Sequence, residues 1–187
     1  MEKQLAQVSA PAERWDILHK LSRSWFLDDL AKAADYAQQS AQLAADLKDA
    51  QKRAKSAIIQ AEIAQKNGRL AAARSFFEQA KTAADEAQLP GLALDALANL
   101  HKLSAEQGDH KAAYQWSLEW ATRAQIEANR AATEQKKQHE ATQQETIQQK
   151  DRERNILLGV LALCAIGFLW FFYSRQRANR RIAGELA

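Results

Sequence analysis

Helix-breaking residues and cysteine are scarce in this sequence. Its 187 residues include two prolines, six glycines and one cysteine. Because Cys164 has no second cysteine to pair with in the chain, an intramolecular disulfide framework is excluded. Few breakers favour long helices, and the interleaved alanine, glutamine, lysine and glutamate residues lose little conformational freedom in a helix. The composition therefore predicts an all-α fold.

The motifs of common catalytic and cofactor sites are also missing. The sequence contains no GxxxxGKS/T phosphate loop, no GxGxxG dinucleotide pattern, no HExxH zinc motif and no CxxC pair. The adjacent carboxylates Asp28 and Asp29 stand at an expected helix start, where acidic side chains cap the backbone. The four histidines are scattered at spacings that suit a metal poorly: His19, His101, His110 and His139. We therefore expect no enzyme, no cofactor and no metal site.

The basic excess of the chain is confined to its C-terminal part. The formal net charge is +3, and residues 151–187 alone hold six arginines against three acidic residues, so residues 1–150 are formally neutral. A neutral N-terminal part offers no basic face to nucleic acid. We therefore expect no nucleic-acid partner.

Three segments of the N-terminal part align with one another as successive copies of one pattern. Their turns fall at Asp28, Gly68 and Gly108, and a small residue follows five positions after each turn: Ala33, Ala73 and Ala113. Glycine at a turn can adopt the left-handed conformation that ends a helix, and alanine lets two helices approach closely. Large residues just beyond the alanines are predicted to pack against the partner helix: Phe76, Phe77, Tyr114 and Trp116. Each segment is therefore predicted to form a helix, a turn and a second helix.

On these residues the sequence resembles the tetratricopeptide repeat family, in a long variant of about 40 residues found in membrane-anchored bacterial sensor and signalling proteins. The resemblance implies a solenoid of helix–turn–helix units at 12–49, 50–89 and 90–126, preceded by an N-terminal segment at 1–11. The positions that define the repeat are turn glycines, small residues and one large residue: Gly68, Ala73, Phe77, Ala80, Gly108 and Ala113.

In that family the first helix of each unit lines a concave face that binds other proteins or peptides. Carried over by position, this face combines apolar side chains with charges of both signs. It comprises Trp15, Leu18, His19 and Ser22 from the first unit, Lys55, Ile58, Ile59 and Glu62 from the second, and Asp95, Asn99 and Lys102 from the third. The resemblance implies a protein-binding groove at these residues, and a solvated face without a ligand is the alternative.

Residues 127–154 form a polar stretch with very few large apolar side chains. Ile147 is the single large aliphatic residue in it, and no glycine or proline interrupts the chain between Gly108 and Gly159. A stable coiled coil needs apolar side chains at two positions of every heptad. We expect either a solvated helical stalk or a marginal coiled coil that supports a weak homodimer.

The run Ile156–Tyr173 carries no charged residue. A helix of about 18 residues spans roughly 27 Å, which is close to the thickness of the hydrocarbon core of a bilayer. We expect residues 155–174 to be a transmembrane helix and residues 175–187 to be a basic helical tail. Aromatic and basic residues at the end of the run are expected at the membrane interface: Trp170, Tyr173, Arg175 and Arg177.

The charges that flank the run predict its orientation. Lys and Arg residues number three on its N-terminal side and four on its C-terminal side, which favours a cytoplasmic tail. We expect a single-pass protein of the bacterial inner membrane with periplasmic repeats, acting as the sensory part of a signalling protein that contacts other proteins. Because no signal peptide opens the sequence, a tail-anchored scaffold for envelope or secretion complexes is the alternative.

Overall fold

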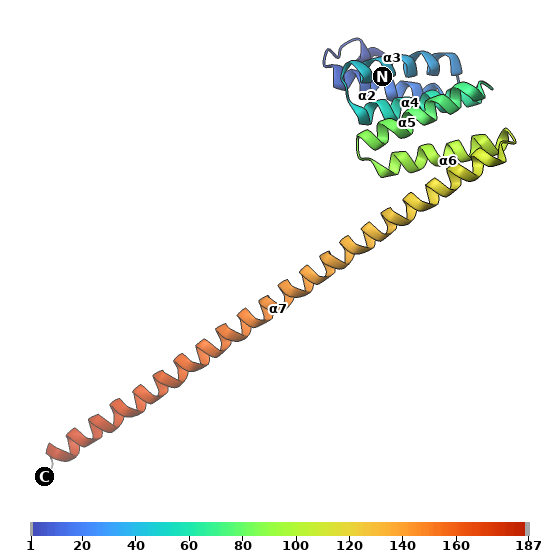
Figure 1. The fold of residues 1–187 in the computed structure, drawn as a ribbon. Coiled ribbons are helices and arrows are strands. Elements are labelled where there is room, and N and C mark those ends of the chain that lie inside the picture. The colour runs from blue at the N-terminus through green and yellow to red at the C-terminus, as the bar shows by residue number, and fades with distance from the viewer. Residues whose placement is uncertain (1, 186–187) are drawn as a thin grey trace. The chain divides into compact units, whose positions relative to one another are not determined.

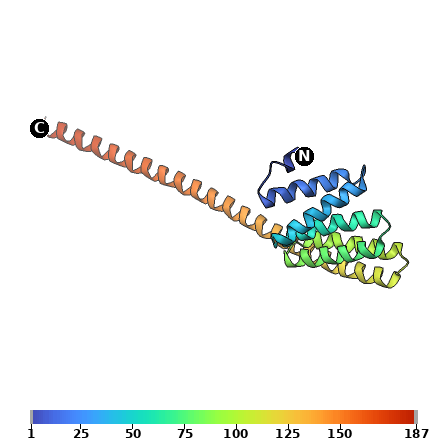
Figure 2. The ribbon, with the colours of Figure 1, turned by 90° about the horizontal axis from the view of Figure 1, so that it is seen from above.

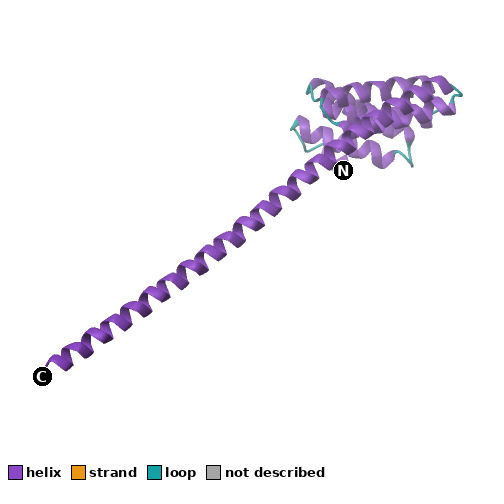
Figure 3. Cartoon of the chain, turned by 60° about the horizontal axis from the view of Figure 1, so that its bottom comes forward, coloured by secondary structure: helices purple, strands orange, loops and turns teal. Residues whose placement is uncertain are grey.

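The described part of the chain, residues 2–185, consists of helices joined by short turns and contains no strand. Its structure is a computed structural model, in which side chains are described up to residue 171 and at residues 173 and 175. The helices are α1 (Glu2–Leu5), α2 (Pro11–Trp25), α3 (Leu30–Asp46), α4 (Ala50–Lys66), α5 (Leu70–Glu86), α6 (Pro90–Glu106) and α7 (His110–Glu185) (Figures 1 and 3). The all-α prediction is confirmed.

The chain divides into two units. The first is compact and ends at Asn129, and the second begins at Arg130. Within the first unit each helix from α2 to α5 packs against the next one in the sequence, and α4 also contacts α2 and α6 (Figure 2). These contacts bring α2, α4 and α6 to one side of the unit.

The helices of the first unit recur at a constant spacing along the chain. From α3 to α6 each has 17 residues, and they start at Leu30, Ala50, Leu70 and Pro90. An aspartate caps three helix starts, and its Oδ1 accepts hydrogen bonds from backbone N–H groups of the first turn. Asp29 accepts from Lys32 at 3.0 Å, Asp49 from Lys52 at 3.0 Å and Asp109 from Ala112 at 3.0 Å. The acidic cap expected at Asp28 and Asp29 is therefore provided by Asp29.

Each of the helices α3 to α6 is followed by one residue with positive φ. Gly68 and Gly108 have φ values of 72° and 74°, as expected for turn glycines, but Lys48 and Gln88 hold the same place with φ values of 52° and 54°. The amide of the next residue then closes the turn onto the helix, as Arg69 does by donating to Ala64 O at 2.8 Å. The turn recurs after all four helices, but glycine marks it only after every second one.

The core between the helices is built largely from alanine. The largest side chain at its centre is Phe77 of α5, which lies fully buried in a cluster with Ala61 and Ala64 of α4 and Leu100 of α6. Ala73 and Ala113 are buried, in accord with the expected close helix contacts. Phe76 and Trp116 pack at the edge of the same cluster. The prediction that Tyr114 packs against the partner helix is wrong, since its side chain is 67% exposed.

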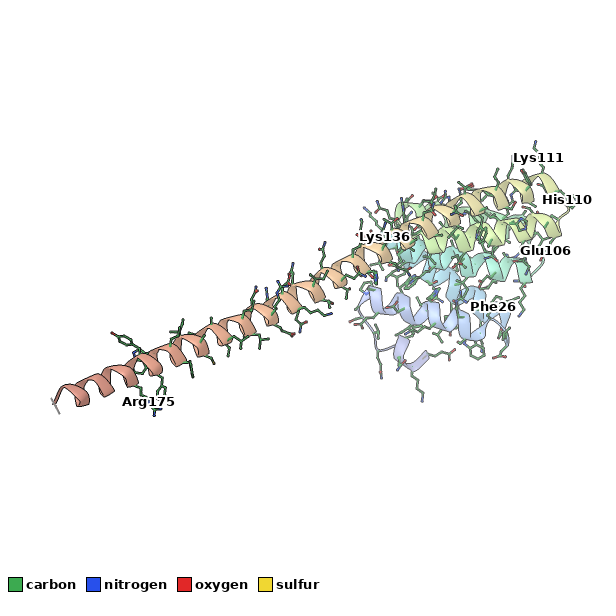
Figure 4. All side chains as sticks on the ribbon, turned by 90° about the horizontal axis from the view of Figure 1, so that it is seen from below. Phe26, Glu106, His110, Lys111, Lys136 and Arg175 are labelled. Carbon is green, nitrogen blue, oxygen red and sulfur yellow. The ribbon has the colours of Figure 1, made fainter. Side chains whose placement is uncertain are left out.

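Within the second unit, α7 carries one stretch that is long and apolar enough to cross a membrane, judged by length and composition. The described side chains of that stretch are exposed within the second unit. Trp170, Tyr173 and Arg175 are exposed at its end, and Figure 4 labels Arg175. The side chain of Arg177, also expected at the membrane interface, lies outside the described residues.

Candidate binding groove

A hollow of about 500 Å³ lies along the side of the first unit where α2, α4 and α6 come together. Its lining residues follow helical spacings of three and four, which place them on one face of each helix. They are Trp15, Asp16, His19, Lys20 and Arg23 of α2, Lys55, Ile58 and Glu62 of α4, and Leu92, Asp95, Ala98 and Asn99 of α6. We call this hollow the α2–α4–α6 groove.

Most of the residues expected on the concave face line this groove: Trp15, His19, Lys55, Ile58, Glu62, Asp95 and Asn99. Leu18, Ser22 and Ile59 are buried between helices instead. Each of the three is adjacent in sequence to a lining residue, and one step along a helix turns a side chain by about 100°. Lys102 is exposed, pairs with Glu106 at 3.9 Å and is not part of the lining.

Five lining residues were not predicted from the sequence: Asp16, Lys20, Arg23, Leu92 and Ala98. The first three are close neighbours of Trp15 or His19 on α2, so helical periodicity around those predicted residues contains the missing signal. Leu92 follows Pro90, where the sequence indicates only the start of a helix. The groove is therefore wider toward the start of α6 than the family resemblance implied.

The α2 wall is held by a buried aromatic side chain. The Trp15 ring stacks on the His19 ring with their centroids 4.8 Å apart and an interplanar angle of 11°. The Trp15 Nε1–H donates to Ser56 Oγ of α4 at 3.0 Å, and Ser56 Oγ lies 3.3 Å from Ser40 Oγ of α3. The Lys52 Nζ atom stands 4.7 Å from the centre of the Trp15 ring. Trp15 therefore fixes the position of His19 and is itself nearly covered.

His19 presents a neutral ring to the groove at pH 7. Its pKa is lowered from 6.5 to about 4, chiefly by burial and then by the positive charges of Arg23 and Lys55, while Asp16 partly opposes them. The Nδ1 atom of this ring is buried without a hydrogen-bond partner in the protein. Buried polar atoms are normally paired, so this unpaired nitrogen is an exception in the wall of the groove.

The groove carries equal numbers of cationic and anionic side chains. Lys20, Arg23 and Lys55 face Asp16, Glu62 and Asp95. An Arg23 guanidinium nitrogen lies 3.9 Å from a Glu62 carboxylate oxygen. Burial raises the pKa of Glu62, Arg23 lowers it and Asp95 raises it. The groove is thus suited to a ligand that offers charges of both signs.

We expect the first unit to lose stability on acidification through His19. Between about pH 6.5 and 4 the folded chain keeps this ring neutral while the unfolded chain protonates it, because the folded pKa is lowered from 6.5 to about 4. The stabilising contribution is therefore complete above pH 6.5 and decreases as the pH falls. The measurement is thermal unfolding of the full parent chain and of His19→Gln at pH 7.5 and pH 5. Between these two pH values the free energy of unfolding is expected to fall less in His19→Gln than in the parent chain, by on the order of 1–2 kcal/mol. Equal losses in both chains would contradict this role, since the Glu62 titration is common to both.

A second hollow of about 440 Å³ lies between α3, α4 and α5. Ala41, Ala45, Ala57 and Ala83 are among its lining residues, and an ion pair between Arg53 and Glu86 closes part of its rim. The charges of Arg53 and Glu86 are thus paired with each other, while the buried Nε atom of Arg53 has no hydrogen-bond partner in the protein.

No group of three or more His, Cys, Asp or Glu residues within the described residues could hold a metal ion. Comparison with protein-family models found no match to this chain, and comparison with curated proteins also found none.

Proposed function

We propose that this chain is a membrane-anchored module that binds an extended segment of another protein in the α2–α4–α6 groove. The observation that carries the proposal is the groove itself, in which three helices expose balanced charges to a hollow of about 500 Å³. This volume falls within the roughly 300–1,000 Å³ typical of ligand sites. The regular helix pairs and the sequence repeat that matches them support a tetratricopeptide-like solenoid.

The dimensions of the groove favour an extended segment over a folded partner. Packed helices lie about 8–10 Å apart, so a line across three of them measures roughly 16–20 Å. At about 3.3 Å per residue, an extended segment of about five or six residues crosses the groove. Because the lining carries charges of both signs, we propose a segment with acidic and basic side chains.

The apolar run of α7 supports the anchoring part of the proposal. We propose that it spans the bacterial inner membrane with the repeats in the periplasm and the tail in the cytoplasm, since the arginines after the run outnumber the basic residues before it. In this arrangement the groove is the input site of a signalling protein, and no chemical reaction is assigned to it.

The test is selection of binding peptides from a random octapeptide library on the full chain in detergent micelles. Lys55→Glu and Asp95→Lys are each expected to weaken the selected peptides at least tenfold, because each replaces an attractive charge with a repulsive one. The control is Lys102→Glu, which makes the same charge change as Lys55→Glu at a residue of α6 that does not line the groove. It is expected to alter the affinity for the selected peptides less than twofold. Failure to enrich any peptide, or equal losses in all three variants, would refute binding in the groove.

A further inference from the structure

The large exposed apolar side chains of the first unit are concentrated on α7. In residues 2–129 they are Leu27, Tyr114, Leu118, Trp120 and Ile126, and all of them except Leu27 belong to α7. Tyr114 lies one helical turn after His110 and Lys111, which Figure 4 labels at the start of α7. Clustered apolar exposure on a protein surface indicates an interaction site.

The helix α5 occupies in the preceding repeat the place that α7 occupies in the last one, and the side of α5 that faces the next repeat is charged. On α5 the side facing α7 carries Arg74, Lys81 and Asp85. Arg74 pairs with Asp109 of the turn before α7 at 3.7 Å, Lys81 with Glu119 at 2.8 Å and Asp85 with Arg123 at 2.5 Å. At the corresponding positions of the next repeat, α7 holds Tyr114, Ala121 and Gln125, and the exposed Leu118 lies one helical turn after Tyr114. The side of α7 that continues the stack therefore has no charged residue at these positions.

Trp120 occupies a position on α7 that is buried on α5. Its equivalent on α5 is Ala80, which is fully buried in a cluster with residues of α4 and α6. No further helix of the first unit follows α7, and Trp120 is 42% exposed. We call Tyr114, Leu118, Trp120, Ala121 and Gln125 the α7 end face. Terminal repeats of soluble solenoids normally have a polar outer surface, whereas Tyr114, Leu118 and Trp120 are exposed on this one.

We propose that the α7 end face is the contact surface for a second copy of this chain. Two charged residues of α7 beside it, Glu119 and Arg123, are already paired with Lys81 and Asp85 inside the unit, and the exposed Lys111 lies at its edge, one turn before Tyr114. Two identical faces can therefore meet about a twofold axis with Glu119 and Arg123 kept in pairs within each copy. Tyr114 and Leu118 stand one helical turn apart and form a ridge that can interdigitate with the same ridge of the other copy.

The choice of a second copy rests on the membrane anchoring proposed above. The apolar run belongs to the same helix as the end face, so two anchored copies are inserted with the same polarity. Confinement to one membrane also raises their effective concentration, which allows a small contact to be occupied. In such a pair Leu118 of one copy lies next to Leu118 of the other.

The first experiment is disulfide cross-linking of the full chain in its membrane, in a Cys164→Ser background. Leu118→Cys is expected to give a covalent homodimer on oxidation. The matched control is Leu27→Cys, which replaces a leucine that is 80% exposed but lies in the turn after α2, and it is expected to stay monomeric. Cross-linking of Leu118→Cys to a different protein, or equal dimer yields from both positions, would overturn the proposal.

The second experiment uses the twofold symmetry of the contact. Leu118→Asp and Leu118→Lys are each expected to reduce dimer formation at least tenfold, measured with a cysteine at position 114, and their coexpression is expected to restore a mixed dimer. Leu118 is exposed in the single chain, so circular dichroism is expected to show unchanged helicity in both variants. Dimer yields that are the same in all combinations would overturn the proposal. Carbonate extraction of the same membranes tests the anchoring separately, because a chain that resists extraction but does not cross-link refutes self-association alone.

Discussion

Replacing Phe77 with alanine is expected to lower the free energy of unfolding of the first unit by about 3–5 kcal/mol. The ring is fully buried and packs with side chains of α4 and α6 as well as its own helix. Its neighbours include Ala61 and Ala64, whose short side chains cannot move into the vacated space. The cavity therefore persists, and residual cavity volume is what makes such substitutions costly.

Urea or thermal unfolding of the full chain, followed by circular dichroism of the helical signal, measures this effect. For a unit of this size we expect the melting temperature to fall by roughly 10–20 °C. Leu27→Ala is the control, because it truncates an 80% exposed side chain and is expected to change the stability by less than about 0.5 kcal/mol. Similar melting temperatures for Phe77→Ala and Leu27→Ala would show that Phe77 is not the centre of the core.

Two arginines in the middle of the apolar run are expected to release the chain from the membrane. Leu163→Arg together with Ile166→Arg places two charges near the centre of Ile156–Tyr173. Each arginine at the centre of a spanning helix costs about 2.5–3.5 kcal/mol of insertion free energy, so the pair removes most of the preference for the bilayer. We expect the double variant in the supernatant after carbonate extraction and the parent chain in the pellet.

The matched control is Leu163→Val with Ile166→Val, which keeps the run apolar and is expected to remain in the pellet. A parent chain that is itself extracted by carbonate would refute the spanning helix. A reporter fused after the last residue adds the orientation, because alkaline phosphatase is inactive in the cytoplasm and is therefore expected to be inactive there.

Local signals in the sequence were sufficient to predict the helical fold, whereas the groove residues were predicted from the family resemblance. Turn glycines at 68 and 108 mark two helix ends because positive φ has little cost for glycine. Lys48 and Gln88 adopt the same conformation although they are not glycine. Because glycine marks only every second turn, the sequence shows a repeat of two helices, whereas the structure repeats after each helix and its turn. Tertiary packing selects this conformation at those two positions, and residue type does not indicate it.

The errors at the groove and at the end of the stack have different physical causes. Leu18 and Ile59 were assigned to the groove from family positions, but one step along a helix moves a side chain from the lining to the interior. Tyr114 was expected to pack against the partner helix because it is a large residue directly after the small residue Ala113, but its equivalent on α5 is the charged Arg74. On α7 one neighbour is missing, and a sequence pattern contains no information about where the stack ends.

The regular stacking of similar helices also determines how the first unit opens. In a linear array each helix is stabilised by its immediate neighbours, so local unfolding begins at an end, where one set of contacts is absent. The helix at the N-terminal end is α2, apart from the short α1, and α2 provides one wall of the groove. A bound segment that contacts α2, α4 and α6 at once connects helices that are not consecutive in the array, in which most contacts join consecutive helices. Ligand binding is then expected to slow amide hydrogen exchange in α2 more than in α4. With the ligand bound, α2 is expected to open only when the whole unit unfolds.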